Sequence, residues 1–236
     1  MAGLLESFIE DAKRIYGGKL RSIILYGSRA DGEDIRDHSD YNLLVILDTV
    51  TAEDIKALSP VIAGWIKRGN QPPLIFTSDY FRRSADVFPI EFLDMKEKHK
   101  VLYGEDLLKD LAVERLNLRH ECEFELKSKL LKLRQAYMVA AGKPKQVQEL
   151  LIGSVSSFLV LFRSVIRLMG KEPPAKKLDS LHVLAGSTGI NTSAFVTVME
   201  MKQGNKEVYK QDPEQLMKEY LSGIEKIVTL VDDLTA

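Results

Sequence analysis

Two short polar segments, each next to an apolar run, carry residue types that could bind a phosphate and a metal ion. The first is Gly27-Ser28-Arg29, which follows the apolar run Ile23–Tyr26. A strand that turns on a glycine into a helix N-terminus directs backbone N–H groups outward, where they can hold a phosphate. The second is Asp40-Tyr41-Asn42, at the mouth of another apolar run, and side chains two residues apart on a strand leave the same face. The sequence therefore predicts a phosphate cradle beside oxygen ligands for a metal ion, as metal-dependent phosphoryl or nucleotidyl transfer requires.

The same residues resemble the signature of a known superfamily. Gly27-Ser28, a spacer, and then Asp40 in the pattern Asp-hydrophobic-acid-hydrophobic are similar to the motif of the DNA polymerase β-like nucleotidyltransferases. The chain looks most like the small bacterial branch that includes the kanamycin and minimal nucleotidyltransferase types. The resemblance covers roughly residues 20 to 103 and breaks at Asn42, where the family has a second acid.

The resemblance implies a reaction and a role for each residue. A hydroxyl would attack the α-phosphorus of a nucleoside triphosphate, with ATP as the expected donor of AMP, and pyrophosphate would leave. Gly27 would let the backbone approach the triphosphate, Ser28 would donate to a β- or γ-phosphate oxygen, and Arg29 would reach a phosphate. Asp40 would be the bridging ligand of Mg²⁺, which the family uses as a pair of ions. By itself, Arg29 could equally be an ion-pair partner of Asp31 or Glu33.

A third carboxylate is expected from the run Val87–Met95, which we interpret as a strand. On such a strand Glu91 and Leu93 share one side. The segment resembles the third acidic strand of the family, so Glu91 takes the position of a metal ligand and general base for the acceptor hydroxyl. Without the resemblance, Glu91 would be a solvent-facing strand residue.

Asn42 changes the charge of the expected metal site, which comprises Asp40, Asn42 and Glu91. An amide oxygen can ligate Mg²⁺, but it is neutral. At ~4 Å and an effective dielectric of ~20, each lost unit charge pair removes ~4 kcal/mol of attraction before desolvation. Two outcomes follow: one firmly held ion with a second arriving with the substrate, or a nucleotide-binding or structural relic. A neighbouring acid such as Asp37 could also move into the site.

Composition limits the class of partner and the compartment. The chain has 33 basic and 34 acidic residues; 14 and 16 of them lie up to Gly104, leaving 19 and 18 after it. Neither half is basic enough to bind long nucleic acid through charge, which favours a small acceptor. The single cysteine, Cys122, excludes an internal disulfide and is typical of a reducing compartment. No signal peptide and no apolar stretch of ~20 residues is recognised, so we expect a cytoplasmic protein without membrane contact.

The elements expected to position the site form an α/β domain over residues 1–104. Apolar residues at helical spacing predict a helix before Gly17, and Thr51 with Asp54 predicts the start of a second helix ending near Lys67. The expected strands are 22–26, 41–47 and 74–77, followed by the run Val87–Met95.

Residues 105–236 have the pattern of an all-α bundle. The expected helices are one up to Gly142, one from Pro144 to Gly170, two short ones near 180–185 and 194–202, and a last one from Pro213. The sequence thus predicts an α+β chain: a nucleotidyltransferase domain with a short mixed sheet, then a helical bundle that shapes the acceptor pocket. Cys122 is expected to be a partly buried residue of the first of these helices.

Three functions remain open on the sequence. The first is Mg²⁺-dependent transfer of a nucleoside monophosphate to a hydroxyl of a small molecule or a protein. The second is a catalytically degenerate nucleotide-binding protein that acts through its helical bundle as a homodimer. The third, distant one is a HEPN-like ribonuclease, because Arg115-Leu116-Asn117-Leu118-Arg119-His120 fits the loose Arg-x4-6-His pattern.

Overall fold

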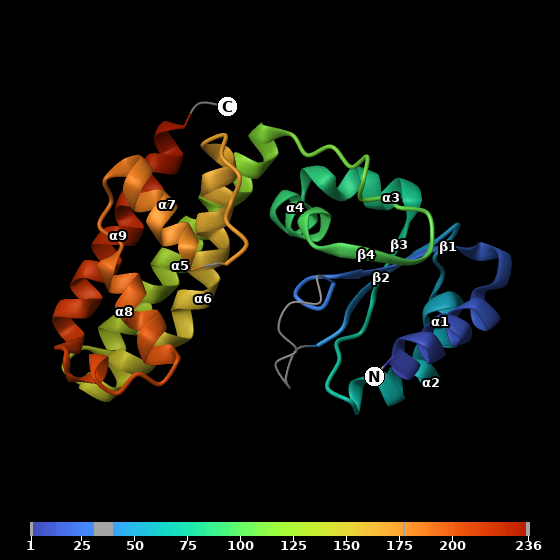
Figure 1. Cartoon of the computed structure of the whole chain (residues 1–236), viewed down its shortest axis with the longest axis horizontal. Helices are drawn as coiled ribbons and strands as arrows, with labels where there is room; N and C mark the ends of the chain where they lie inside the picture. The colour runs from blue at the N-terminus through green and yellow to red at the C-terminus, as the bar shows by residue number, and fades with distance from the viewer. Residues whose placement is uncertain (1, 31–39, 177, 235–236) are drawn as a thin grey trace. The chain divides into compact units, whose positions relative to one another are not determined.

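The computed structural model describes residues 2–30, 40–176 and 178–234 of the chain. They form two compact units, Met1–Val113 and Glu114–Ala236. The first unit combines a four-stranded sheet with helices, and the second contains helices alone among its described residues (Figure 1). The α+β fold class expected from the sequence is confirmed.

The sheet of the first unit has the strand order β3-β2-β1-β4. Its strands are β1 (Leu20–Tyr26), β2 (Asn42–Leu47), β3 (Leu74–Thr77) and β4 (His99–Gly104). β1 pairs antiparallel with both neighbours, so that Tyr26 lies opposite Asn42 on β2 and His99 on β4. β2 and β3 are parallel. One end of the sheet therefore collects the end of β1 and the starts of the other three strands.

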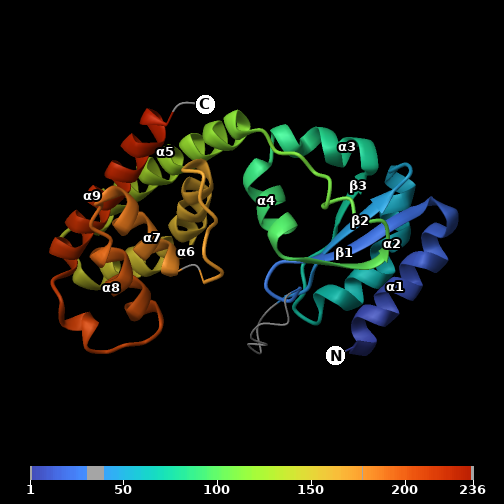
Figure 2. The same cartoon turned by 45° about the horizontal axis from the view of Figure 1, so that its top comes forward.

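Helices cover both faces of this sheet (Figure 2). The helices on one face are α1 (Ala2–Tyr16) and α2 (Ala52–Ile66), and those on the other are α3 (Ser78–Arg83) and α4 (Pro89–Glu97). Strand side chains alternate between the two cores: Leu43 and Val45 pack with α1 and α2, whereas Leu44 and Ile46 pack with α3 and α4. Such alternation explains why β2 reads as a continuous apolar run.

The predicted start of α2 is confirmed in detail. The Thr51 hydroxyl accepts from the Asp54 N–H at 3.2 Å, and the Asp54 carboxylate accepts from the Thr51 N–H at 3.0 Å. This reciprocal capping box satisfies two N–H groups that the helix leaves free. Because the signal is local in sequence, it could be recognised without any tertiary information.

The strand predicted for Val87–Met95 is wrong. These residues follow the 3₁₀ turn Ser84–Asp86 and form most of α4, with Pro89 at its first position, where the missing N–H costs nothing. Ile90, Phe92 and Met95 are buried, and the last two pack against the sheet. The fourth strand is β4, which begins two residues after α4 ends.

The first unit extends beyond the boundary that the sequence suggested. We expected it to end at Gly104, but residues 105–113 belong to it. Leu107, Leu108 and Leu111 are buried in the core beneath α3 and α4. These leucines lie in no helix or strand, so no periodicity revealed their burial.

The second unit is built from five α-helices within its described residues: α5 (Arg115–Ala140), α6 (Pro144–Leu168), α7 (Asp179–Thr188), α8 (Ser193–Lys202) and α9 (Pro213–Asp233). The predicted helices are confirmed, and Asp212 caps α9 by accepting from the Glu214 N–H at 3.0 Å. Aromatic side chains of α6, α8 and α9 meet in the core, where Phe195 lies 5.0 Å from Phe162 and 4.6 Å from Tyr220. Cys122 is fully buried rather than partly buried.

α6 is long and apolar enough to cross a membrane by length and composition, although we expected no such segment. Within the bundle, 56% of its most apolar window is buried. It contacts α5, α7, α8 and α9. Its hydrophobicity is therefore accounted for by its place at the centre of the bundle.

Candidate functional site

Gly27 is the turning point at the end of β1. Its φ is +80°, a left-handed conformation that strongly favours glycine. A Cβ at this position would lie 3.3 Å from Asn42 Nδ2, so the backbone passes close to that amide. The Gly27 N–H donates to the Lys98 carbonyl at 2.8 Å, and the Ala30 N–H donates back to the Gly27 carbonyl at 3.0 Å. The glycine thus lies where β1, β2 and the end of α4 meet. We call this end of the sheet, with Gly27, Ser28, Asp40 and Asn42, the corner.

Ser28 and Arg29 lie in the turn that follows this glycine. The helix N-terminus predicted to follow them falls on residues 31–39, outside the described residues. Ser28 is exposed, whereas the Arg29 guanidinium lies over the Tyr41 ring at 4.2 Å. Arg29 Nε is buried without a hydrogen-bond partner among the described residues. Its alternative partners, Asp31 and Glu33, lie outside the described part of the chain.

Tyr41 and Asn70 position the segment that leads into β2 through a contact that no sequence pattern indicates. The Asn70 Oδ1 accepts from the Tyr41 N–H at 3.0 Å, and Asn70 is buried. The Tyr41 ring in turn lies 6.0 Å from the Trp65 ring of α2. The segment carrying Asp40 is therefore held in place by a polar and an aromatic contact.

Asp40 and Asn42 lie at the start of β2, at the same end of the sheet as Gly27. Asn42 is the first residue of the strand and pairs with Tyr26, while Asp40 precedes the strand. Both side chains are half-buried, and neither forms a hydrogen bond or ion pair with any other described residue. Half-buried polar side chains that lack a partner among the described residues are available to a ligand at a strand end.

The donor set at this corner fits one Mg²⁺ better than two. Asp40 offers a carboxylate and Asn42 a neutral amide oxygen, and Mg²⁺ typically takes one or two carboxylates and completes its shell with water and substrate phosphates. Residues 2–30, 40–176 and 178–234 contain no group of three or more His, Cys, Asp or Glu side chains that could hold a metal ion. A pair of ions held by shared carboxylates does not fit these residues.

The neighbouring parallel strand adds no acid. Leu74 of β3 lies beside Leu44 of β2, so the chain enters this end of the sheet through Gln71-Pro72-Pro73. None of these three side chains carries a charge. The strand next to Asp40 thus offers Mg²⁺ no anionic ligand.

Glu91 is not on a strand of the sheet. It is exposed in the first turn of α4, and it is the other end of α4, at Lys98, that contacts Gly27. Seven residues of helix span about 10 Å, which separates Glu91 from that contact along the axis. The strand geometry behind the Glu91 assignment is therefore absent, and its catalytic and metal-binding role stays a prediction.

A second polar cluster lies beside the corner on β4. His99, opposite Tyr26, has Nδ1 3.0 Å from the Lys96 carbonyl and Nε2 3.2 Å from the Asp106 carboxylate. Burial raises the pKa of Asp106, but hydrogen bonds from His99 and two backbone N–H groups outweigh it and hold this pKa below its ordinary value. Burial also raises the pKa of Tyr26, which keeps its phenol neutral. Because both His99 nitrogens have partners, this histidine stabilises the corner rather than facing a ligand.

The ribonuclease pattern does not form a joint site. Arg115 is the first residue of α5, and its Nη2 donates to the Leu168 carbonyl at 2.8 Å. His120 is exposed. Five residues along a helix turn the side-chain direction by about 140°, so Arg115 and His120 leave α5 in different directions. The guanidinium instead contacts the end of α6.

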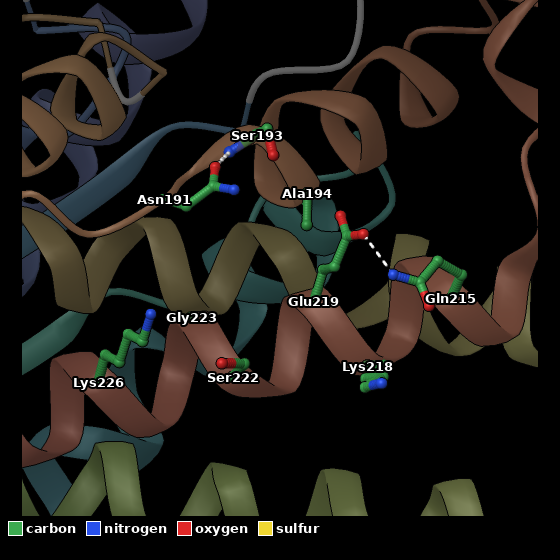
Figure 3. Close-up of a pocket in the computed structure, with 9 residues that line it drawn as sticks. All are labelled: Asn191, Ser193, Ala194, Gln215, Lys218, Glu219, Ser222, Gly223 and Lys226. Atoms are coloured by element: carbon green, nitrogen blue, oxygen red, sulfur yellow. Dashed lines mark hydrogen bonds between the residues drawn. The ribbon is translucent and has the colours of Figure 1, made fainter.

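A surface pocket in the second unit lies between the start of α8 and α9 (Figure 3). On one wall the Ser193 N–H donates to Asn191 Oδ1 at 2.9 Å, and on the other Gln215 Nε2 donates to Glu219 at 2.6 Å. Lys226 also lines it. The first bond joins α8 to the residue just before its N-cap and the second lies within α9, so neither crosses the pocket, which is a feature of the bundle surface rather than a preorganised site.

Comparison with known proteins supports the fold. No family model matches the sequence, and none of the curated proteins matches it. The structure is similar to the crystal structure of spectinomycin adenyltransferase AAD(9) from Enterococcus faecialis with ATP and spectinomycin, with a TM-score of 0.56 and 14% identity. The match covers 97% of this chain and 99% of that chain. At this identity the likeness shows a shared fold: over nearly its whole length the chain has the architecture of that structure.

Proposed function

We propose that this chain is a nucleotidyltransferase that transfers a nucleoside monophosphate, AMP from ATP, to a hydroxyl of a small molecule. One observation carries the proposal. The end of β1 and the start of β2 bring Gly27 and Ser28 together with Asp40 and Asn42, and the last three keep their side chains unpaired among the described residues. The fold shared with an adenyltransferase supports the same reaction.

In the proposed reaction the acceptor oxygen forms a bond to the α-phosphorus and the bond to pyrophosphate breaks. The left-handed turn at Gly27 lets the backbone approach the triphosphate, and the Ser28 hydroxyl donates to a phosphate oxygen. The Arg29 guanidinium, oriented on Tyr41, adds positive charge where negative charge accumulates. Asp40 and Asn42 would hold Mg²⁺, which would neutralise phosphate charge. The acceptor hydroxyl must lose its proton, and Glu91 remains the predicted base.

A second candidate is a nucleotide-binding protein of the same fold without transferase activity. The small number of carboxylates at the corner favours this second candidate. Asn42 is neutral, Gln71-Pro72-Pro73 adds no acid, and Glu91 lies on α4 rather than on a strand of the sheet. Fewer carboxylates weaken the attraction for a dication. Both candidates require that ATP binds at the Gly27 corner. We further propose a cytoplasmic location, where ATP and reduced cysteine are both available.

Calorimetry with ATP, in the presence and absence of Mg²⁺, tests the shared requirement. We expect binding that Mg²⁺ strengthens. ATP labelled at the α-phosphate, incubated with the protein and a hydroxyl acceptor such as spectinomycin, then tests transfer. Labelled acceptor with released pyrophosphate supports the transferase, and binding without transfer to any acceptor supports the second candidate. Absence of ATP binding under both conditions contradicts both.

The variant Asn42→Asp separates the two candidates further. If the corner still has the geometry of a metal site, the added carboxylate should raise Mg²⁺-dependent ATP affinity by about tenfold or more. Asn42→Ala is the matched control, since it removes the amide without adding charge. Equal affinities for all three proteins would show that this position does not face the metal.

A further inference from the structure

Asn70 is a buried polar side chain that links two segments far apart in the sequence. It follows the turn at the end of α2, and 7% of its surface is exposed. Its Oδ1 accepts from the Tyr41 N–H at 3.0 Å, and its Nδ2 donates to the Trp65 carbonyl at 3.4 Å. Each end of the amide therefore has a partner of the complementary kind, as a buried amide requires.

The Trp65 side of this link is anchored in the core of the first unit. Trp65 is 2% exposed, and its ring lies 5.0 Å from the Phe8 ring of α1. Its Nε1 donates to the Gln71 carbonyl at 2.8 Å, so the chain on both sides of Asn70 is held to the same buried residue. Asn70 consequently extends toward Tyr41 from a fixed support.

The Tyr41 side of the link is not fixed by the sheet. The ladder between β1 and β2 begins at Asn42, and Asp40 and Tyr41 precede it. The Tyr41 N–H belongs to the planar peptide group that joins Asp40 to Tyr41. The hydrogen bond from this N–H to Asn70 therefore sets the plane of that group, and the Asp40 carboxylate leaves from the Cα next to it.

The aromatic rings close the same arrangement. The Tyr41 ring lies 6.0 Å from the Trp65 ring, so Asn70, Tyr41 and Trp65 contact one another pairwise. Two contacts that restrain one residue from different directions leave it less freedom than either does alone. Tyr41 is thus held through its backbone and through its ring.

We propose that Asn70 is a positioning residue of the corner: through the peptide group of Tyr41 it sets the direction in which Asp40 presents its carboxylate to Mg²⁺ and ATP. This role rests on the proposed function, because that function makes Asp40 the anionic metal ligand. Asn70 itself touches neither metal nor phosphate. Without it the same ligands remain, but the Asp40 carboxylate samples more directions, and a ligand out of place binds less well.

Calorimetry of ATP binding to the full chain in the presence of Mg²⁺ tests this role. Asn70→Ala should lower the affinity about fivefold to tenfold, since it removes the acceptor of the Tyr41 N–H. Asn191→Ala is the matched control, because Asn191 Oδ1 also accepts a backbone N–H, that of Ser193 at 2.9 Å, but in the second unit. It should leave the affinity unchanged.

A double-variant cycle distinguishes positioning of Asp40 from a general loss of structure. In the Asp40→Ala background, Asn70→Ala should lower the affinity for ATP by less than about twofold, because the carboxylate that it positions is already gone. A merely structural role would give the same factor in both backgrounds. Asn70→Ser serves beside Asn70→Ala if the latter does not fold, since its shorter side chain keeps a hydroxyl near the Trp65 carbonyl.

Trp65 provides a spectroscopic test that needs no nucleotide. It is the single tryptophan of the chain, so its emission reports on the contact with Tyr41. Asn70→Ala should change this emission and increase its quenching by acrylamide, whereas Asn191→Ala should change neither. Circular dichroism checks that both variants keep their helical content.

The outcomes separate this role from the proposed function. A wild type that does not bind ATP contradicts the proposed function, and the role of Asn70 with it. A wild type that binds ATP, together with an Asn70→Ala variant of equal affinity, overturns the role of Asn70 alone. Equal losses in the two backgrounds, or unchanged Trp65 emission, would overturn it as well.

Discussion

Polar side chains at the sheet corner lack the hydrogen-bond partners among the described residues that Glu214 of the helical unit has. In the helical unit Glu214 accepts from the Tyr137 hydroxyl and from the Gly142 N–H at 2.7 Å, so that it joins the end of α5 to the start of α9. At the corner, Ser28, Asp40 and Asn42 have no such partners among the described residues. Paired groups stabilise the protein that contains them, and unpaired groups at a strand end can be satisfied by a ligand.

The contrast is not complete, because Ser164 and Ser180 in the helical unit have buried hydroxyls without partners in the described structure. These two lie within packed helices, where no turn or strand end opens toward solvent. The difference between the regions is therefore one of access as well as pairing. It predicts that equivalent substitutions change stability in one region and ligand binding in the other.

Removal of one carboxylate from each region should give the largest and clearest contrast. Asp40→Ala should lower Mg²⁺-dependent ATP affinity on the order of a hundredfold, because it removes the anionic ligand at the corner. Its free energy of unfolding should stay within about 0.5 kcal/mol of the wild type, since no partner among the described residues is lost. Calorimetry and urea unfolding measure the two quantities.

Glu214→Ala is the matched variant in the helical unit and should behave in the opposite way. It leaves the Gly142 N–H and the Tyr137 hydroxyl without their acceptor, which should cost about 2 kcal/mol of stability. ATP affinity should be unchanged. A loss of stability in Asp40→Ala as large as in Glu214→Ala would contradict the contrast.

Two glycine substitutions test how closely the backbone of Gly27 approaches the Asn42 side chain. Gly27 and Gly69 both have left-handed φ values, +80° and +85°, but only Gly27 has a neighbour, Asn42, within 4 Å of an added Cβ. Gly69→Ala should therefore lower the free energy of unfolding by about 1 kcal/mol through backbone strain alone. Gly27→Ala should lower it by more, because the added Cβ also contacts Asn42. The same urea measurement reports both, and equal costs would show that the corner tolerates a side chain.

Local signals account for what could be predicted from the sequence. The capping box at Thr51, the start of α9 at Asp212-Pro213 and strand β3 each depend on a few adjacent residues. Gly27 and Asp40 were found through a motif whose parts lie at the ends of two predicted strands, and the antiparallel pairing of these strands brings both residues to one end of the sheet.

Features that depend on distant contacts could not be predicted in this way. Val87–Met95 is apolar nearly throughout, so its sequence fits a strand as well as a helix, and only packing against the sheet selects α4. The buried side chain of Asn70 reaches Tyr41 across 29 residues, a separation that no spacing rule connects. Both features matter for the candidate site, because α4 and Asn70 help to determine which groups lie near Asp40.

Two hydroxyl groups of the first unit give the smallest but most closely matched test. The Thr51 hydroxyl accepts from the Asp54 N–H at the start of α2, whereas the Ser28 hydroxyl is exposed at the corner without a partner among the described residues. Thr51→Ala should lower the free energy of unfolding by about 1 kcal/mol, the usual cost of a lost N-cap. Ser28→Ala should change stability by no more than about 0.5 kcal/mol, because it breaks no hydrogen bond to the described part of the chain. If the hydroxyl donates to a phosphate, Ser28→Ala should instead weaken ATP binding by about fivefold to tenfold, while Thr51→Ala leaves it unchanged. Urea unfolding and calorimetry on both variants distinguish these outcomes, and loss of stability without loss of ATP affinity in Ser28→Ala would remove Ser28 from the binding site.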